Sequence, residues 1–97
     1  MDKKKKLSIV IPVYFNELNL KKLYDAIDKD VLVNIKKYDY EIVFVDDGSK
    51  DNSVMVIREL MKKDKKIKLV KLSRNFGSHN AILAGLTVSS GDVAAFI

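Results

Sequence analysis

Short apolar runs alternate with amphipathic stretches along the whole chain, and this alternation is the strongest constraint on its fold. The apolar runs at residues 7–13, 40–45 and 67–72 are rich in β-branched residues, as in strands that are buried on both faces. Apolar residues recur at helical spacing between the runs, and a third helix is expected over 78–88 before a fourth strand begins at Val93. The order β-α-β-α-β-α-β predicts an α/β fold with a parallel sheet.

The handedness of the strand connections predicts how this sheet is arranged. Right-handed crossovers place the second and third strands in turn on one side of the first strand. The order of addition then reverses, so the fourth strand lies on the other side of the first, which gives the strand order 3-2-1-4. The first two helices then cover one face of the sheet, and the third helix covers the other. Ala81 and Gly85 belong to a small-residue face of the third helix, which permits close packing. Asn16 is the expected N-cap of the first helix, and Asp51 or Ser49 that of the second.

The composition narrows the classes of function. The sequence has no cysteine, so it offers neither a disulfide framework nor a thiolate metal site. The net charge is +5, but sixteen of the eighteen cationic residues are lysine, whereas a nucleic-acid reader relies on arginine for bidentate contacts. We therefore expect no nucleic-acid partner. No apolar run approaches the roughly 20 residues of a membrane-spanning helix.

Residues 1–6 form a basic tail with four consecutive lysines. We interpret the tail as a solvated extension that leads into the first strand, although a lysine cluster can also rest on anionic lipid with about 1 kcal/mol per residue. The sequence stops at Ile97, within an apolar run that no cap, turn or helix follows. Residues 1–97 are therefore interpreted as one partial domain, the N-terminal part of a larger protein.

The polar residues that could carry chemistry follow the predicted strands. Ligands of open α/β sheets bind beyond the carboxyl ends of the strands, and Asp46-Asp47 directly follow the second strand. Two adjacent carboxylates repel each other, so either one of them accepts hydrogen bonds from a ligand or both serve only the turn. Arg74, after the third strand, either binds a diphosphate beside a helix N-terminus or is a paired surface residue.

The end of the first strand offers Tyr14 and Glu17. The Tyr14 ring could cover a flat base, and Glu17 could accept a hydrogen bond from a ribose or a base; alternatively, Tyr14 covers the strand end and Glu17 serves the helix dipole. His79 is the only histidine, and without a second histidine or a cysteine we interpret it as a residue of the helix start. Neither the dinucleotide-binding Gly-x-Gly-x-x-Gly pattern nor a phosphate-binding Gly-Lys-Ser/Thr loop is present.

Four motifs occur in a defined order and spacing: Ile-Val-Ile-Pro-Val-Tyr-Phe-Asn-Glu at 9–17, Val-Asp-Asp-Gly-Ser-Lys-Asp at 45–51, Leu-Ser-Arg-Asn-Phe-Gly at 72–77 and Ala-Ile-Leu-Ala-Gly-Leu at 81–86. Together they resemble the family 2 glycosyltransferases. The Ser-Arg-Asn-Phe-Gly segment is similar to the branch that transfers a sugar to a polyprenyl phosphate, such as dolichol-phosphate mannose synthases and bactoprenol glucosyltransferases. The resemblance implies a Rossmann-like sheet that forms the N-terminal, nucleotide-binding part of a GT-A fold.

The resemblance also implies which residues bind a nucleotide-diphosphate sugar, UDP- or GDP-linked. Three residues would line the nucleoside pocket, two adjacent aspartates would hold the base and the ribose, and two more would lie near the diphosphate or the acceptor phosphate. In that order they are Pro12, Tyr14 and Glu17, then Asp46 and Asp47, then Arg74 and Asn75.

For a whole enzyme the resemblance implies an inverting displacement at the anomeric carbon, with Mg²⁺ or Mn²⁺ at the leaving diphosphate. The family's metal-binding Asp-x-Asp follows the fourth strand, so the metal ligands and the catalytic residues are expected after Ile97. The implied acceptor is a polyprenyl phosphate at the cytoplasmic face of a membrane. The isolated chain is expected to be inactive and to self-associate through uncovered apolar surface.

Two other functions remain open from the sequence. A receiver-type phospho-acceptor domain also has paired aspartates at a strand end, but it has them after the first strand, whereas here they follow the second. A glycosyltransferase that acts on a polysaccharide or another glycan would share the same nucleotide-sugar motifs and differ only in its acceptor.

Overall fold

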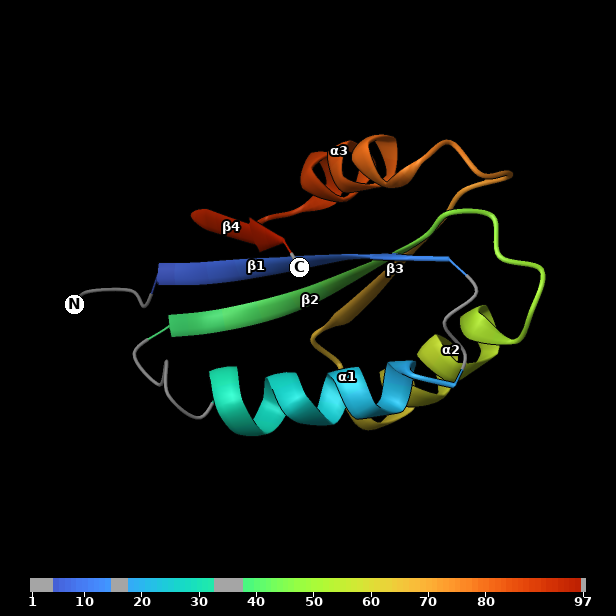
Figure 1. Cartoon of the computed structure of the whole chain (residues 1–97). Helices are drawn as coiled ribbons and strands as arrows, with labels where there is room; N and C mark the ends of the chain where they lie inside the picture. Colours follow the sequence, from blue (N-terminus) through green and yellow to red (C-terminus); the bar gives the residue numbers. More distant parts are fainter. Residues whose placement is uncertain (1–4, 15–17, 33–37, 97) are drawn as a thin grey trace.

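The computed structural model describes residues 5–14, 18–32 and 38–96, and its centre is a parallel four-stranded sheet (Figure 1). The order of the strands is β3-β2-β1-β4, which confirms the order predicted from the connections. The inner strands β1 and β2 are nine residues long and pair along their whole length. The strands are β1 (Lys5–Val13), β2 (Tyr38–Asp46), β3 (Ile67–Lys71) and β4 (Val93–Phe96).

Helices cover both faces of the sheet, as the sequence predicted (Figure 1). α1 (Leu20–Ala26), which continues as the π-helical segment η1 (Ile27–Leu32), lies with α2 (Ser53–Lys63) on one face. α3 (Ser78–Val88) lies on the other face. Within the described ranges no helix combines the length and the apolar character that crossing a membrane requires.

The first two helices begin at other positions than the sequence predicted. The N-cap position of α1 is Asn19 rather than Asn16, which lies outside the described residues. The N-cap position of α2 directly precedes Ser53, so neither Ser49 nor Asp51 occupies it. Asp51 still supports the start of α2, because its Oδ1 accepts hydrogen bonds from the amide of Ser53 at 3.0 Å and from the hydroxyl at 2.6 Å.

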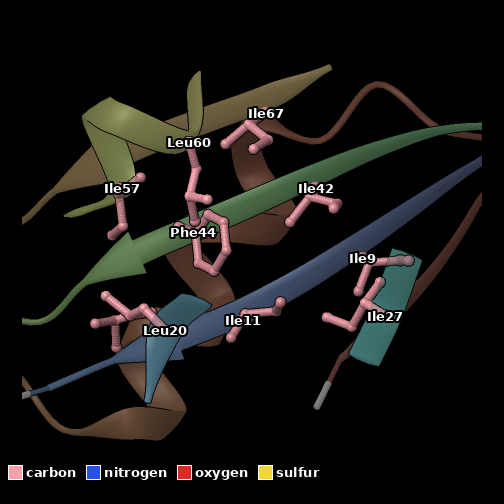
Figure 2. Close-up of a cluster of buried hydrophobic side chains, with 10 residues drawn as sticks. Ile9, Ile11, Leu20, Ile27, Ile42, Phe44, Ile57, Leu60 and Ile67 are labelled. Atoms are coloured by element: carbon pink, nitrogen blue, oxygen red, sulfur yellow. The ribbon is translucent and has the colours of Figure 1, made fainter. Parts of the chain in front are cut away.

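The larger core lies between the sheet and the helices α1 and α2 (Figure 2). Alternate residues of the inner strands point to this face, where they meet apolar side chains of the helices. Phe44, on β2, is fully buried within this cluster. The buried members of the cluster are Ile9, Ile11, Val13, Leu20, Ile27, Ile42, Phe44, Ile57, Leu60 and Ile67.

A smaller core lies on the opposite face, beneath α3, and contains Val10, Val43, Val45 and Ala81. Gly85 lets the helix approach the strands closely, because a Cβ there would lie 2.4 Å from Cγ1 of Val10 and 2.8 Å from Cγ2 of Val45. The small-residue face predicted for the third helix is therefore confirmed. This close packing fixes α3 over the inner strands, with its N-terminus next to the loop that leaves β3.

Candidate functional site

Three loops meet at the carboxyl edge of the sheet, after β1, β2 and β3, and contribute to a pocket of about 250 Å³. This is the edge at which open α/β sheets bind their ligands. Four of the seven residues singled out in the sequence line this one pocket. The lining residues are Pro12, Val13, Tyr14, Asp47, Asn75, Gly77 and Ser78.

Asp47 joins the loop after β2 to the start of α3. Its side chain is almost fully buried, and both carboxylate oxygens accept hydrogen bonds from backbone amides. Oδ1 accepts from the amide of Phe76 at 2.7 Å, and Oδ2 accepts from the amide of Gly77 at 3.0 Å. The N-terminus of a helix carries a partial positive charge, so the carboxylate is stabilised there.

Asp46 has different surroundings from its neighbour. It follows Phe44 in the alternation of β2, so its side chain points toward the α1 and α2 face and away from the pocket. Its Oδ2 accepts a 3.1 Å hydrogen bond from the amide of Ser49, whereas its fully buried Oδ1 has no hydrogen-bond partner among the described residues. Because the two carboxylates point to opposite faces, their mutual repulsion is smaller than adjacency in the sequence suggested.

Gly48 allows the loop after β2 to touch the loop after β3. A Cβ at this position would lie 2.4 Å from the carbonyl carbon of Arg74 and 2.5 Å from the amide nitrogen of Asn75. The backbone of Gly48 also has a positive φ of 79°, which side-chain-bearing residues rarely adopt. Position 48 therefore requires glycine for two reasons: the positive φ of the turn, and the close contact with the backbone of the loop after β3.

The structure describes two of the three residues that the sequence singled out at the end of β1. Pro12 and Tyr14 line the pocket, and the Tyr14 ring is 46% exposed. Glu17 lies outside the described residues.

Arg74 is not among the residues that line the pocket. Its guanidinium lies over the ring of Phe76, with Cζ 4.8 Å from the ring centroid. Asn75 does line the pocket, and its Oδ1 accepts a 2.8 Å hydrogen bond from the amide of Gly77. One of the two interpretations from the sequence placed a diphosphate beside the amides of this helix start, but the amides of Phe76 and Gly77 donate to the carboxylate of Asp47.

Three residues of the site were not predicted from the sequence. Gly77 and Ser78 line the pocket, and the ring of Phe76 stacks against the guanidinium of Arg74. A glycine directly before a predicted helix was the available signal, since Gly77 has a positive φ of 95°. His79 lies in the first turn of α3. Within the described part of the chain, no three histidine, cysteine, aspartate or glutamate side chains gather closely enough to hold a metal ion.

A parallel sheet in the order 3-2-1-4, with a pocket at the carboxyl ends of its strands, defines an α/β ligand-binding domain. The family model described as glycosyl transferase family 2 matches residues 8–97. The chain therefore belongs to the family 2 glycosyltransferases, which confirms the resemblance carried by the motifs. Membership in this family excludes the receiver-type alternative.

Curated relatives show the same family. The glycosyltransferase YkcC of Bacillus subtilis is 41% identical over 90 residues, which are 93% of this chain and 27% of the relative. The undecaprenyl-phosphate 4-deoxy-4-formamido-L-arabinose transferase of Proteus mirabilis is 38% identical over 93 residues, which are 95% of this chain and 28% of the relative. The chain thus spans about a quarter of the length of these relatives.

Solved structures of glycosyltransferases share the fold. The mannosyltransferase PcManGT from Pyrobaculum calidifontis, in complex with GDP-Man and Mn²⁺, matches with a TM-score of 0.79 at 19% identity, over 95% of this chain and 26% of that chain. TarS of S. aureus, in complex with UDP-GlcNAc, matches with a TM-score of 0.75 at 23% identity, over 95% of this chain and 26% of that chain. The expected Rossmann-like arrangement of a GT-A fold is therefore confirmed.

Proposed function

We propose that this chain is the nucleotide-sugar-binding part of a glycosyltransferase that moves a hexose from a UDP- or GDP-linked donor to a polyprenyl phosphate. The observation that carries the proposal is the pocket at the strand ends, into which the sheet and the loops bring Asp47, Tyr14 and Asn75. Family membership supports glycosyl transfer, and the name of the Proteus mirabilis relative supports a polyprenyl phosphate as the acceptor.

The pocket suits the nucleoside half of such a donor. Each carboxylate oxygen of Asp47 can accept two hydrogen bonds and uses one for a loop amide, so each keeps a site for a base N–H or a ribose hydroxyl. The half-exposed ring of Tyr14 offers a flat apolar face to a base. Of the adjacent aspartates, we therefore assign Asp47 to the ligand and Asp46 to the turn.

We assign the diphosphate to the neighbourhood of Arg74 and not to that of the Asp47 carboxylate. A phosphate beside Asp47 would meet a like charge, whereas Arg74, on the same loop as the pocket residue Asn75, offers a guanidinium with five donors. Stacking on Phe76 leaves the edge of the guanidinium able to bind a phosphate in a bidentate way. The same arginine could serve the acceptor phosphate, which the sequence also suggested.

A divalent metal is part of the proposal for the whole protein. The resemblance implies Mg²⁺ or Mn²⁺, and the complex of PcManGT contains Mn²⁺. The described residues offer no group of ligands for such an ion, so we assign its ligands to other parts of the protein. When bound, a divalent ion supplies charge neutralisation for the leaving diphosphate. A phosphate acceptor carries its own anionic nucleophile, so little is required of a general base.

The acceptor determines where the whole protein works. A polyprenyl phosphate resides in a membrane, so we propose that the protein acts at the cytoplasmic face of one, where lysines at positions 3–5 would favour anionic lipid. The fourth lysine of the basic run, Lys6, instead donates a 2.7 Å hydrogen bond to the hydroxyl of Ser90. Transfer of labelled sugar by the whole protein to undecaprenyl phosphate, and not to an oligosaccharide, would separate this acceptor from the glycan alternative.

Replacement of Asp47 by asparagine or alanine is expected to weaken the binding of UDP or GDP, whichever the wild-type chain prefers, by about 10- to 100-fold. The physical reason is the loss of a charged hydrogen bond worth about 1–3 kcal/mol. Isothermal titration calorimetry measures the affinity. Asp25→Ala, at an exposed position of α1, is the matched control and should keep the wild-type affinity. Equal affinities in wild type and the Asp47 variants would contradict the assignment of the pocket.

Self-association of the isolated chain is a separate expectation that follows from its exposed apolar side chains. Phe96 is 60% exposed on β4, and Val93 and Leu83 are each 49% exposed. Apolar surface of this kind favours a partner, and a net charge of +5 opposes it only modestly. Light scattering at increasing concentration should show an apparent mass above 11.0 kDa. A monomer at every concentration would show that this surface is tolerated in water.

A further inference from the structure

We infer that Asp47 also positions the loop of residues 73–77, and that this loop and a bound nucleotide stabilise each other through the one carboxylate. The inference rests on the proposed function, because it concerns the same pocket. Asp47 is 3% exposed, and its two oxygens accept hydrogen bonds from the amides of Phe76 and Gly77. A carboxylate held by two amides has one orientation before any ligand arrives, and such preorganisation favours binding.

A backbone contact beside Asp47 supports the same loop. Gly48 packs so closely that an added Cβ would lie 2.4 Å from the carbonyl carbon of Arg74 and 2.5 Å from the amide nitrogen of Asn75. No side chain separates the turn after β2 from the loop after β3 at this point. A displacement of the turn is therefore passed directly to the loop.

The location of Arg74 follows from these contacts. Its guanidinium stacks on the ring of Phe76, and the amide of Phe76 is held by Asp47. Asn75, the neighbouring pocket residue, accepts a hydrogen bond from the amide of Gly77, which also donates to Asp47. The residues proposed to lie near the phosphates are thus positioned by the residue proposed to bind the nucleoside.

Coupling between two binding events is reciprocal. If the loop amides orient Asp47 for the nucleotide, the nucleotide must stabilise the loop by the same factor. We therefore expect the amides of Phe76 and Gly77 to exchange their hydrogens more slowly in the complex with UDP or GDP than in the free chain.

The first experiment needs no ligand. In Asp47→Asn one of the two acceptor oxygens becomes an NH₂ group, so at least one of the Phe76 and Gly77 amides should exchange about tenfold faster by NMR. The amide of Phe44, in the core of the sheet, should be unchanged and reports whether the fold is intact. Unchanged exchange at both loop amides would overturn the inference, whatever the chain binds.

The second experiment moves the loop without altering a residue that lines the pocket. Gly48→Ala forces a methyl group against the backbone of Arg74, so the affinity for the diphosphate should fall about tenfold or more, and the affinity for the matching nucleoside should fall less. Lys50→Ala, at an exposed position of the same turn, is the control. Phe76→Ala, which removes the platform under Arg74 from an exposed position, should produce the same split between diphosphate and nucleoside.

The outcomes separate the inference from the proposed function. If the wild-type chain binds UDP or GDP but Gly48→Ala and Phe76→Ala bind the diphosphate as tightly as wild type does, the coupling fails and the proposed function stands. If the wild-type chain binds neither nucleotide, the proposed function fails, and the coupling fails with it.

Discussion

Phe44→Ala is expected to lower the free energy of unfolding by about 3–5 kcal/mol, the usual range for the loss of a large buried aromatic side chain. Phe44 has no exposed surface, and it lies on an inner strand with side chains of α2 packed over it (Figure 2). Alanine would leave a cavity that the surrounding isoleucines and leucines could fill only in part. Urea denaturation followed by circular dichroism measures the change.

Phe96→Ala is the matched control for this variant, because the same substitution then removes a side chain that is 60% exposed. Its effect on unfolding should stay below about 0.5 kcal/mol. If Phe44→Ala lowers the free energy of unfolding by no more than Phe96→Ala does, the sheet and the helices α1 and α2 are not packed as described.

Stability should also fall by about 3 kcal/mol as the pH is lowered from 5 to 2, because of one buried carboxylate. Glu41, near the start of β2, is 2% exposed and points to the α3 face of the sheet. Its carboxylate accepts hydrogen bonds from the hydroxyl of Ser8 at 2.5 Å, the amide of Ser90 at 2.7 Å and, as an ion pair, from Nζ of Lys68 at 2.6 Å. Lys6 lies farther away, at 3.6 Å.

These contacts set the direction of the pH dependence. Burial by itself raises the pKa of Glu41, but the hydrogen bonds from Lys68, Ser8 and the Ser90 amide outweigh burial and lower the pKa from 4.5 to about 2. Because the pKa is lower in the folded chain than in the unfolded chain, the stabilisation is complete above about pH 4.5. It is lost as the pH falls toward 2. Asp39, whose pKa is lowered chiefly by its hydrogen bond from Lys66, acts in the same direction at the surface.

Glu41→Gln tests this assignment. The variant should lose about 3 kcal/mol at pH 7 and should show a flatter dependence of stability on pH below 5, since glutamine cannot titrate. Glu59→Gln, which disrupts only the exposed ion pair with Lys62, is the control and should change stability by less than about 1 kcal/mol. Equal acid sensitivity in wild type and Glu41→Gln would assign the acid transition to other carboxylates.

The arrangement of the sheet could be predicted from the sequence because it depends on rules that act locally. Buried strands are visible as apolar runs, and the handedness of the crossovers then permits few orders. The close packing of α3 was also visible, since a Gly85 on an apolar helix face has few other uses. The start of α1 was not predictable, because Asn16 and Asn19 are both acceptable N-caps in sequence and only the packing of the helix decides between them.

The different surroundings of Asp46 and Asp47 could not be predicted from the sequence. Adjacent residues at a strand end point to opposite faces, and nothing in the sequence shows which face meets the pocket. The contacts that decide it reach from Asp47 to Phe76 and Gly77, which are 29 and 30 positions further along the chain. Glu41 was missed for the same reason, because its partner Ser90 is 49 positions away and the residue itself resembles an exposed start of a strand.

β1 and β2 pair over nine residues, so Glu41 and Asp47 lie near opposite ends of the same pair of strands. Six positions separate Glu41 from Asp47, which at the rise of a β-strand is about 20 Å, more than twice the screening length of physiological salt. Changes at the two carboxylates should therefore add without interaction. Evolution or a protein engineer can alter the pocket at one edge of the sheet while the acid sensitivity set by Glu41 at the other edge is kept.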